Sequence, residues 1–272
     1  MIDIEKTIKT IETEGYALIP QVYEQERINK LLALCKEFYE NSKDQVSKEV
    51  PYLNTNQPTI YNLQNKDIFF LESLFFPKEI ETILIHLLND KWYKQIPSDN
   101  PNYILRSYGA RSSNKGLPLH IDSFIPYTGN HVIGMQMAIV LEDQRIDNGC
   151  TLVIPGSHQF GEYASQEALK KAIAIESKAG DVVLWDSRIW HGTTDNNSGK
   201  TRWAIVATYT RWWIKQHFNI PLNLPQGIYE KLPDKEKAIL GFCSIPYKNE
   251  FEGIDLKTGY EKLKKDVKKY LV

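Results

Sequence analysis

The feature that most constrains the fold is a series of short apolar runs between about residues 102 and 213. The runs are rich in β-branched and aromatic residues, and Gly, Pro, Asn and Asp separate them, which is the pattern of strands joined by turns. Several strands at this spacing favour a sandwich or barrel over a parallel α/β sheet. We predict strands over residues 103–108, 119–122, 134–141, 151–154, 172–177, 182–185 and 202–212.

Amphipathic helical patterns flank this β-rich region on both sides. Residues 42–66 are polar and rich in Pro and Asn, and we predict that they are mostly loop. After residue 213 the chain is broken by prolines and then becomes helical, ending in a lysine-rich helix over 261–270. We predict the other helices over residues 2–14, 24–41 and 67–90, the last interrupted at Pro77, and a short strand over 16–19.

These elements predict a mainly β protein with flanking helices, organised as a single domain over residues 1–272. In this organisation a β core over 102–213 carries an N-terminal helical cover over 1–101 and a C-terminal helical extension over 214–272. Because one face of a sheet must be buried against another layer, we expect the helices to cover one sheet.

Composition restricts the partners and the compartment of the chain. With 33 Lys and Arg against 34 Asp and Glu, the formal net charge is −1, which argues against a nucleic-acid or anionic-membrane binder. The longest apolar runs fall far short of the roughly 18 residues that cross a bilayer. The N-terminus lacks the basic start and apolar core of a signal peptide. The three cysteines are widely spaced and form neither a disulfide framework nor a zinc pattern, so we expect a cytoplasmic protein.

The first candidate for chemistry is the pair His120-Ile121-Asp122. On a strand, residues two apart point to the same face, so an imidazole and a carboxylate would stand side by side, as a metal ion requires. With 6 His and 34 acidic residues in 272, such a pair is expected about once by chance. The pair therefore carries weight only together with the rest of the pattern.

His191 supplies that context. A buried-type strand over 182–185 leads into it, far enough after Asp122 for several strands to go out and return. Two histidines and one carboxylate on neighbouring strands would form a facial triad with open coordination positions, which is typical of non-haem Fe(II) oxygen chemistry. The sequence therefore predicts an iron site at His120, Asp122 and His191.

Arg202 opens the last predicted strand, where Ala204, Val206 and Thr208 share its face. Small residues beside one guanidinium leave room for a ligand. An unpaired buried charge is very costly, and no nearby acidic residue is an obvious partner. A bound dicarboxylate would satisfy this arginine.

The remaining histidines fit structural roles better. His86 lies on an apolar helix, and His217 follows the last strand without an acidic residue nearby. His158 is the rival metal ligand, but it ends a Pro155-Gly156-Ser157 turn that leaves the sheet, which favours a structural or rim role. His131 lies in a loop, where it would touch a substrate at the mouth of the site.

Taken together, these motifs resemble those of the phytanoyl-CoA dioxygenase family over about residues 100–213. The resemblance rests on order and spacing: His120-x-Asp122, then Asn148-Gly149-Cys150-Thr151 through Pro155-Gly156-Ser157-His158, then Gly180-Asp181 leading to His191-Gly192-Thr193, then Arg202. It implies a double-stranded β-helix, or jelly-roll, core of the cupin type. It also implies Fe(II) and 2-oxoglutarate as cofactor and co-substrate, with O₂ as oxidant.

Carried over by residue, the resemblance makes His120, Asp122 and His191 the iron ligands. Arg202 would bind the distal carboxylate of 2-oxoglutarate, with a hydroxyl donor from Thr193, and Gln136 would be a polar group on the cofactor or substrate side. The implied reaction releases succinate and CO₂ and hydroxylates a small molecule, or desaturates or cyclises it. The carboxylate at Asp122 argues for these outcomes over halogenation.

The substrate is the least determined part of the prediction. Basic residues on or beside the core would suit an anionic metabolite, and the tentative substrate residues are Arg106, Tyr108, Trp190, His131 and Arg188. Two alternatives remain open: a cupin-like metalloprotein, such as an isomerase, that does not use 2-oxoglutarate, and a non-catalytic binding module. The oligomeric state is not predicted.

Overall fold

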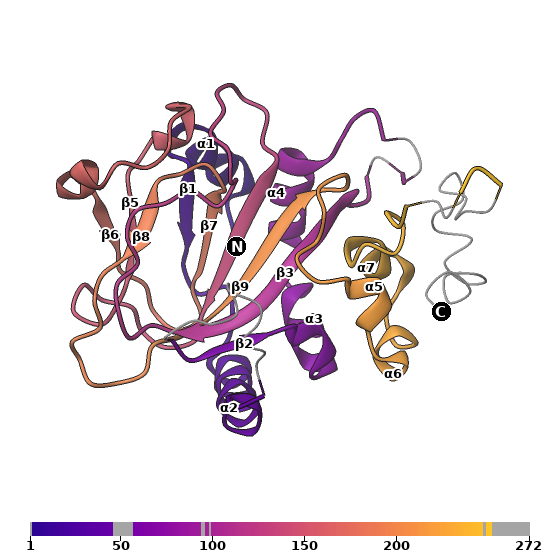
Figure 1. Cartoon of the computed structure of the whole chain (residues 1–272), viewed down its shortest axis with the longest axis horizontal. Helices are drawn as coiled ribbons and strands as arrows, with labels where there is room; N and C mark the ends of the chain where they lie inside the picture. Colours follow the sequence, from indigo (N-terminus) through magenta and orange to yellow (C-terminus); the bar gives the residue numbers. More distant parts are fainter. Residues whose placement is uncertain (1, 46–56, 94–95, 98, 247–248, 252–272) are drawn as a thin grey trace.

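The computed structural model describes residues 2–45, 57–93, 96–97, 99–246 and 249–251. Its centre is an antiparallel sheet of six strands in the order β1-β7-β4-β9-β3-β2 (Figure 1). The strands of this larger sheet are β1 (Tyr16–Ile19), β2 (Thr59–Tyr61), β3 (Tyr103–Ser112), β4 (Gly134–Val140), β7 (Val182–Asp186) and β9 (Trp203–Arg211).

A smaller sheet of three strands faces the inner side of the larger one. Its order is β6-β5-β8, and its strands are β5 (Thr151–Val153), β6 (Ile173–Ile175) and β8 (His191–Thr193). Val153 and Ile175 of this sheet pack with Ala138, Val183 and Trp185 of the larger one. The two antiparallel sheets and their flanking helices confirm the predicted mainly β, jelly-roll fold.

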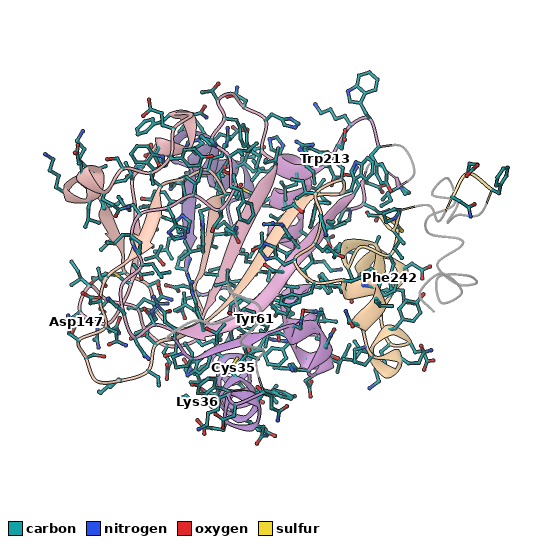
Figure 2. All side chains as sticks on the ribbon, viewed as in Figure 1. Cys35, Lys36, Tyr61, Asp147, Trp213 and Phe242 are labelled. Carbon is teal, nitrogen blue, oxygen red and sulfur yellow. The ribbon has the colours of Figure 1, made fainter. Side chains whose placement is uncertain are left out.

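Helices cover the outer face of the larger sheet and share one hydrophobic core with it. In this core α2 buries Cys35, while the next residue, Lys36, points outward to an ion pair with Glu142 (Figure 2). The covering helices are α1 (Ile4–Glu14), α2 (Gln25–Ser42), α3 (Ile68–Leu74), α4 (Lys78–Leu88) and α7 (Asp234–Ile239), and two single turns, α5 (Ile220–Asn223) and α6 (Gln226–Tyr229), precede α7.

Short 3₁₀ helices complete the described elements, at Leu63–Asn65, Ser157–Gln159 and Gln166–Lys171. The lysine-rich helix predicted over 261–270 lies outside the described residues. No helix in the described part of the chain is both long and apolar enough to cross a membrane. The division into 1–101, 102–213 and 214–272 as parts of a single domain stays a prediction.

Most predicted elements are confirmed, but one predicted strand is absent and two short strands were not predicted. Residues 59–61, predicted as loop, form β2 because they pair with Gly109 to Arg111 of β3. Residues 119–122, predicted as a strand, contain only one isolated bridge, between His120 and His191. Residues 191–193 form β8, which was not predicted. Each of these segments depends on hydrogen bonds to partners distant in sequence, so its own composition is a weak guide.

A β-bulge in β3 decides which side chains enter the interior of the jelly roll. Leu105 pairs with Tyr209 and Ser107 pairs with Thr208, so Arg106 is an extra residue without a partner on β9. An extra residue reverses the alternation of side chains beyond it. From Ser107 onward, alternate residues of β3 therefore face the smaller sheet.

Candidate metal centre and cavity

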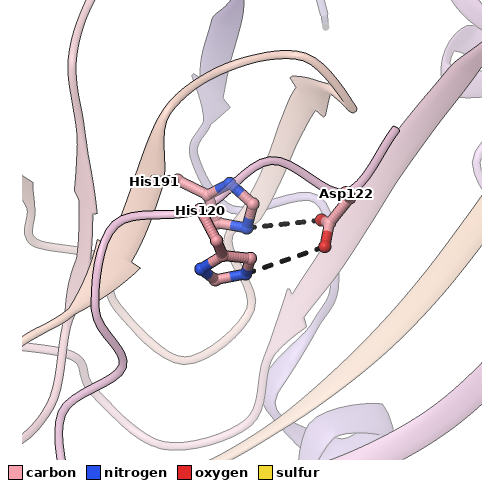
Figure 3. Close-up of side chains that lie close together, drawn as sticks. All are labelled: His120, Asp122 and His191. Atoms are coloured by element: carbon pink, nitrogen blue, oxygen red, sulfur yellow. Dashed lines mark ion pairs between the residues drawn. The ribbon is translucent and has the colours of Figure 1, made fainter. Parts of the chain in front are cut away.

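The side chains of His120, Asp122 and His191 meet between the two sheets (Figure 3). The Nε2 atom of His191 lies 3.3 Å from one carboxylate oxygen of Asp122, and that of His120 lies 3.7 Å from the other. The three ligand atoms all lie within 4.8 Å of one another. Atoms that bind one ion at about 2.1 Å and at right angles stand roughly 3 Å apart, so the spacing suits a single metal ion.

Backbone hydrogen bonds bring the two halves of this cluster together. The N–H of His120 donates to the carbonyl of His191 at 2.8 Å, and the N–H of His191 donates back to His120 at 3.0 Å. Two residues on, the N–H groups of Asp122 and Ser123 both donate to the carbonyl of Ser187. The segment that carries His120 and Asp122 is therefore fixed against the segment that carries His191.

The histidine rings are held in the orientation that metal binding needs. Nδ1 of His120 lies 2.9 Å from the carbonyl oxygen of Pro118, and Nδ1 of His191 lies 3.0 Å from that of Ile189. A carbonyl only accepts hydrogen bonds, so each Nδ1 carries the proton and each Nε2 presents a lone pair. The donor set of two imidazole nitrogens and one carboxylate fits a divalent iron ion.

Electrostatics keep the cluster in its ligating protonation state. Burial by itself would raise the pKa of Asp122, but the charge and hydrogen bond of His191, with the charges of His120 and Arg111, hold it well below its usual range. Burial and the neighbouring His191 lower the pKa of His120. At neutral pH the carboxylate is therefore ionised and the imidazole of His120 is neutral.

Gly192, between His191 and Thr193 on β8, allows the chain to pass close to the metal cluster. A Cβ atom there would lie 2.5 Å from the carbonyl oxygen of Leu117 and 3.2 Å from Pro118. Because backbone cannot yield as a flexible side chain does, we expect Gly192→Ala to lower the free energy of unfolding by roughly 1–3 kcal/mol. It should also weaken Fe(II) binding, since the segment carrying His120 must shift.

Denaturant unfolding and metal titration measure these effects. The control is Gly227→Ala, where an added Cβ meets no atom within 4 Å. If Gly192→Ala matched this control in stability and in Fe(II) affinity, the packing of β8 against residues 117–118 would not be needed for the site.

The metal cluster opens into a cavity of about 710 Å³ between the sheets. Of the residues predicted from sequence, Arg106, Tyr108 and Gln136 line it together with the three metal-ligand candidates. Thr208 donates to Oε1 of Gln136 at 2.6 Å and accepts from Ser107 at 3.0 Å. With its oxygen occupied, Gln136 keeps its amide N–H groups for a ligand.

Arg202 and Thr193 lie deeper than the cavity wall. Arg202 is 3% exposed, one guanidinium nitrogen donates to the carbonyl of Gly149, and Nε has no partner. Burial and the charge of Arg111 lower the pKa of Arg202 to about 9, so it remains charged at neutral pH. Oγ1 of Thr193 accepts from the N–H of Leu117 at 2.9 Å, which leaves its hydroxyl proton free to donate.

Four tentative substrate residues make other contacts in this structure. Tyr108 borders the cavity, but its hydroxyl donates to Phe70 of α3 because the bulge turns its side chain toward the helices. Trp190 is buried in a separate small cluster, where its indole N–H donates to Glu162. His131 and Arg188 line a different cavity, of about 800 Å³. The part of these four residues in substrate binding stays a prediction.

Arg188 has a structural role instead. Its guanidinium pairs with Asp186 at 2.6 Å, donates to the carbonyl of Gly129 and stacks on Tyr127, and both charged groups are almost fully buried. Removing one partner of a buried ion pair leaves the other charge uncompensated. We expect Arg188→Leu to lower the free energy of unfolding by about 3–5 kcal/mol, measured by urea titration.

Arg145 offers a matched control for this change, because its ion pair with Asp147 spans 3.9 Å and both side chains are 64% exposed. Arg145→Leu should change stability by less than about 0.5 kcal/mol. If Arg188→Leu does not fold, adding Asp186→Asn should restore folding, since no charge then remains buried alone. Unchanged stability of Arg188→Leu would contradict the structural role.

Several cavity residues were missed in the sequence. Arg111 lies three residues beyond the predicted end of its strand, and His217 was assigned a structural role. Burial and Arg106 lower the pKa of His217 to about 4, so it is neutral at physiological pH. Aromatic residues at positions far apart in the chain also line the cavity: Tyr61, Phe124 and Phe218. Local sequence carries no signal for Arg111, because simple alternation from Arg106 would place it on the opposite face and the bulge reverses that alternation.

Curated relatives share limited regions with the chain. The "Uncharacterized protein Rv1501" of Mycobacterium tuberculosis is 30% identical over 115 residues, which is 42% of each chain. The "Dioxygenase FUM3" of Gibberella moniliformis is 32% identical over 97 residues, or 36% of this chain and 32% of that one. The chain thus spans less than half the length of these relatives in each match.

Solved structures and family models extend the comparison. The epimerase SnoN, determined in complex with Fe³⁺, alpha ketoglutarate and nogalamycin RO, aligns with a TM-score of 0.57 and 16% identity, covering 76% of this chain and 83% of that one. At this identity the likeness concerns the fold alone. The family model of the phytanoyl-CoA dioxygenases (PhyH) matches residues 11–204, which is most of the chain and includes the whole metal cluster. The chain belongs to the phytanoyl-CoA dioxygenase family.

Proposed function

We propose that this protein is an Fe(II)- and 2-oxoglutarate-dependent dioxygenase that oxidises a C–H bond of a small molecule and releases succinate and CO₂. One observation carries the proposal. Two imidazoles and a carboxylate, close enough together to bind one metal ion, line a cavity, and the guanidinium groups of Arg111 and Arg202 lie beside them with few hydrogen-bond partners. Family membership and the similarity to named dioxygenases support it.

In this proposal His120, Asp122 and His191 hold the ferrous ion. When bound with the keto acid, the ion supplies the activation of O₂ that attack on an unreactive C–H bond requires. The chain supplies rigid ligands, because the carbonyls of Pro118 and Ile189 fix both rings. Three protein ligands leave coordination positions for the co-substrate and for O₂.

The co-substrate site is built from Arg202, Thr193 and Gln136. The unpartnered Nε of Arg202 and the free hydroxyl proton of Thr193 would donate to the distal carboxylate. These side chains lie behind the cavity wall, so we propose that the dicarboxylate reaches in to them. Gln136 would donate from its amide on the cavity side of the metal.

The substrate is a small molecule with apolar and anionic parts. Phe124 and Phe218, with Tyr61, provide apolar surface in the cavity wall. Positive charge in the cavity wall comes from Lys115 and from Arg106, the extra residue of the bulge. The Arg106 guanidinium stacks 4.6 Å from the centre of the Phe124 ring. We propose hydroxylation as the reaction, or desaturation or ring closure by the same oxidant, in the cytoplasm, where the three buried free thiols would stay reduced.

The test is the charge-transfer absorption band that a 2-oxo acid gives when it chelates ferrous iron. Anaerobic protein with Fe(II) should develop this band on addition of 2-oxoglutarate, and O₂ should then discharge it with release of succinate. A protein that binds Fe(II) but gives neither band nor succinate would instead be a metalloprotein of the cupin type that does not use 2-oxoglutarate. Metabolite screening with succinate release as the readout would then identify the substrate.

A further inference from the structure

Arg111 stands next to Arg202 on the inner face of the larger sheet. It lies on β3 directly opposite Ala204 of β9, and Arg202 precedes Ala204 by two residues on the same face. Two guanidinium groups therefore project toward the interior, one from β3 and one from the residue just before β9. Arg111 lines the cavity that holds the metal cluster, whereas Arg202 lies behind the wall.

The two arginines lack negative charge to balance them. The guanidinium of Arg111 makes no hydrogen bond or ion pair with any residue that the structure describes, and Nε of Arg202 is also without a partner. Among the described residues that line the cavity, Asp122 is the one acid, and it is committed to the metal. Arg202 is almost fully buried and Arg111 is half-buried, so placing the two like charges side by side is costly, and this arrangement favours an anionic ligand with more than one charge.

The positions of the two arginines match the two ends of a dicarboxylate. Arg111 lines the same cavity as His120, Asp122 and His191, so it lies on the metal side of the pair. Arg202 does not line that cavity and donates to the carbonyl of Gly149 instead. A 2-oxo acid that chelated the ion through its 1-carboxylate would hold that carboxylate in the part of the cavity that Arg111 shares with the metal ligands.

We propose that Arg111 is a second cation of the co-substrate site and forms an ion pair with the 1-carboxylate of 2-oxoglutarate. Arg202 then serves the distal carboxylate, and each end of the dianion meets its own guanidinium. The inference rests on the proposed function. The inference goes beyond the proposed function because it assigns the binding of the 1-carboxylate to Arg111 of β3, a residue outside the motifs that run from His120 to Arg202.

The experiment compares two ligands that differ at one end. 2-Oxopentanoate has the same chain length as 2-oxoglutarate and the same chelating group, but a methyl group replaces the distal carboxylate. Binding of each acid to the anaerobic Fe(II) protein is measured by titration of the charge-transfer band and, independently, by calorimetry. The proteins are the unmodified chain, Arg111→Gln, Arg111→Lys, Arg202→Gln and the surface control Arg145→Gln.

Arg111→Gln should weaken both acids by a similar factor, about ten- to a hundredfold, because both carry the 1-carboxylate. Arg202→Gln should weaken 2-oxoglutarate and leave 2-oxopentanoate nearly unchanged. Arg111→Lys should recover part of the affinity for both acids, since it keeps the charge and loses the planar fork. Arg145→Gln should bind both acids as the unmodified chain does.

Two results would overturn the assignment while the proposed function stands. In the first, Arg111→Gln binds both acids normally, so Arg111 has no part in the co-substrate site. In the second, the loss is confined to 2-oxoglutarate, so Arg111 serves the distal end. If the unmodified Fe(II) protein binds neither acid, the proposed function itself fails, and this inference fails with it. Thermal unfolding of the metal-free variants separates a loss of binding from a loss of folding.

Discussion

Replacing Asp122 with alanine is expected to abolish succinate release from 2-oxoglutarate and to weaken Fe(II) binding by roughly a hundredfold or more. The carboxylate is the only anionic group in the cluster, and its oxygens lie 3.3 and 3.7 Å from the two imidazole nitrogens. Without it, two imidazoles remain, and the ion loses both a ligand and its charge compensation. Metal titration followed by a coupled succinate assay measures the two effects.

The matched control for this variant is Asp147→Ala, because Asp147 is 64% exposed and its one ion pair, to Arg145, spans 3.9 Å. It should keep the metal affinity and turnover of the unmodified chain. An Asp122→Ala protein with full turnover would show that the metal ligands have been misassigned. If the variant bound Fe(II) normally but released no succinate, Asp122 would be needed for the reaction and not for metal binding.

Arg202→Gln is expected to weaken 2-oxoglutarate binding by about a hundredfold while raising the stability of the ligand-free protein. The two effects have one cause, which is a guanidinium buried beside Arg111 with its Nε unpartnered. Because this environment lowers the pKa of Arg202 to about 9, the folded state holds fewer protons than the unfolded state between about pH 9 and 12.5. The contribution of Arg202 to stability should therefore rise with pH through that range, whereas buried tyrosine and cysteine groups, whose pKa values are raised, contribute a fall.

The glutamine variant should lack the contribution of Arg202, since glutamine does not titrate, so its stability advantage over the unmodified chain should shrink as the pH rises above about 9. Thermal unfolding at neutral pH and at pH 10, with and without 2-oxoglutarate, measures both the stability and the binding of 2-oxoglutarate. Fe(II) affinity serves as the internal control because Arg202 is not a metal ligand in this proposal. A variant that is less stable than the unmodified chain and binds 2-oxoglutarate equally well would show that Arg202 is a structural residue.

Local sequence predicted the strands whose side chains pack on both faces. Residues 134–140 of β4 and 182–186 of β7 are buried throughout, and their continuous apolar runs carry that information without reference to neighbours. The flanking helices were predicted for a similar reason, because their apolar faces repeat at helical spacing. The short strands β2 and β8 have no such run and owe their extended form to pairing.

The substrate side of the cavity was the least predictable part of the molecule. Simple alternation along β3 places Arg106 and Tyr108 on one face, but the bulge at Arg106 sends Tyr108 to the helices and brings Arg111 to the metal side. A bulge is fixed by the register against β9, which local sequence does not specify. The buried ion pair of Arg188 with Asp186 was likewise not predicted, because the two side chains come together out of contact with water only in the fold.

The amino-acid sequence alone determined the kind of chemistry, because the identity and order of His120, Asp122, His191 and Arg202 limit which ion and which co-substrate the chain can hold. The tertiary structure alone decided which side chains share the cavity with that ion. Side-chain identity is a local property, whereas orientation depends on strand register, the bulge and contacts between residues far apart in the chain. The position of the Arg111 guanidinium beside the metal cluster is the clearest example, because it depends on strand register and on the bulge.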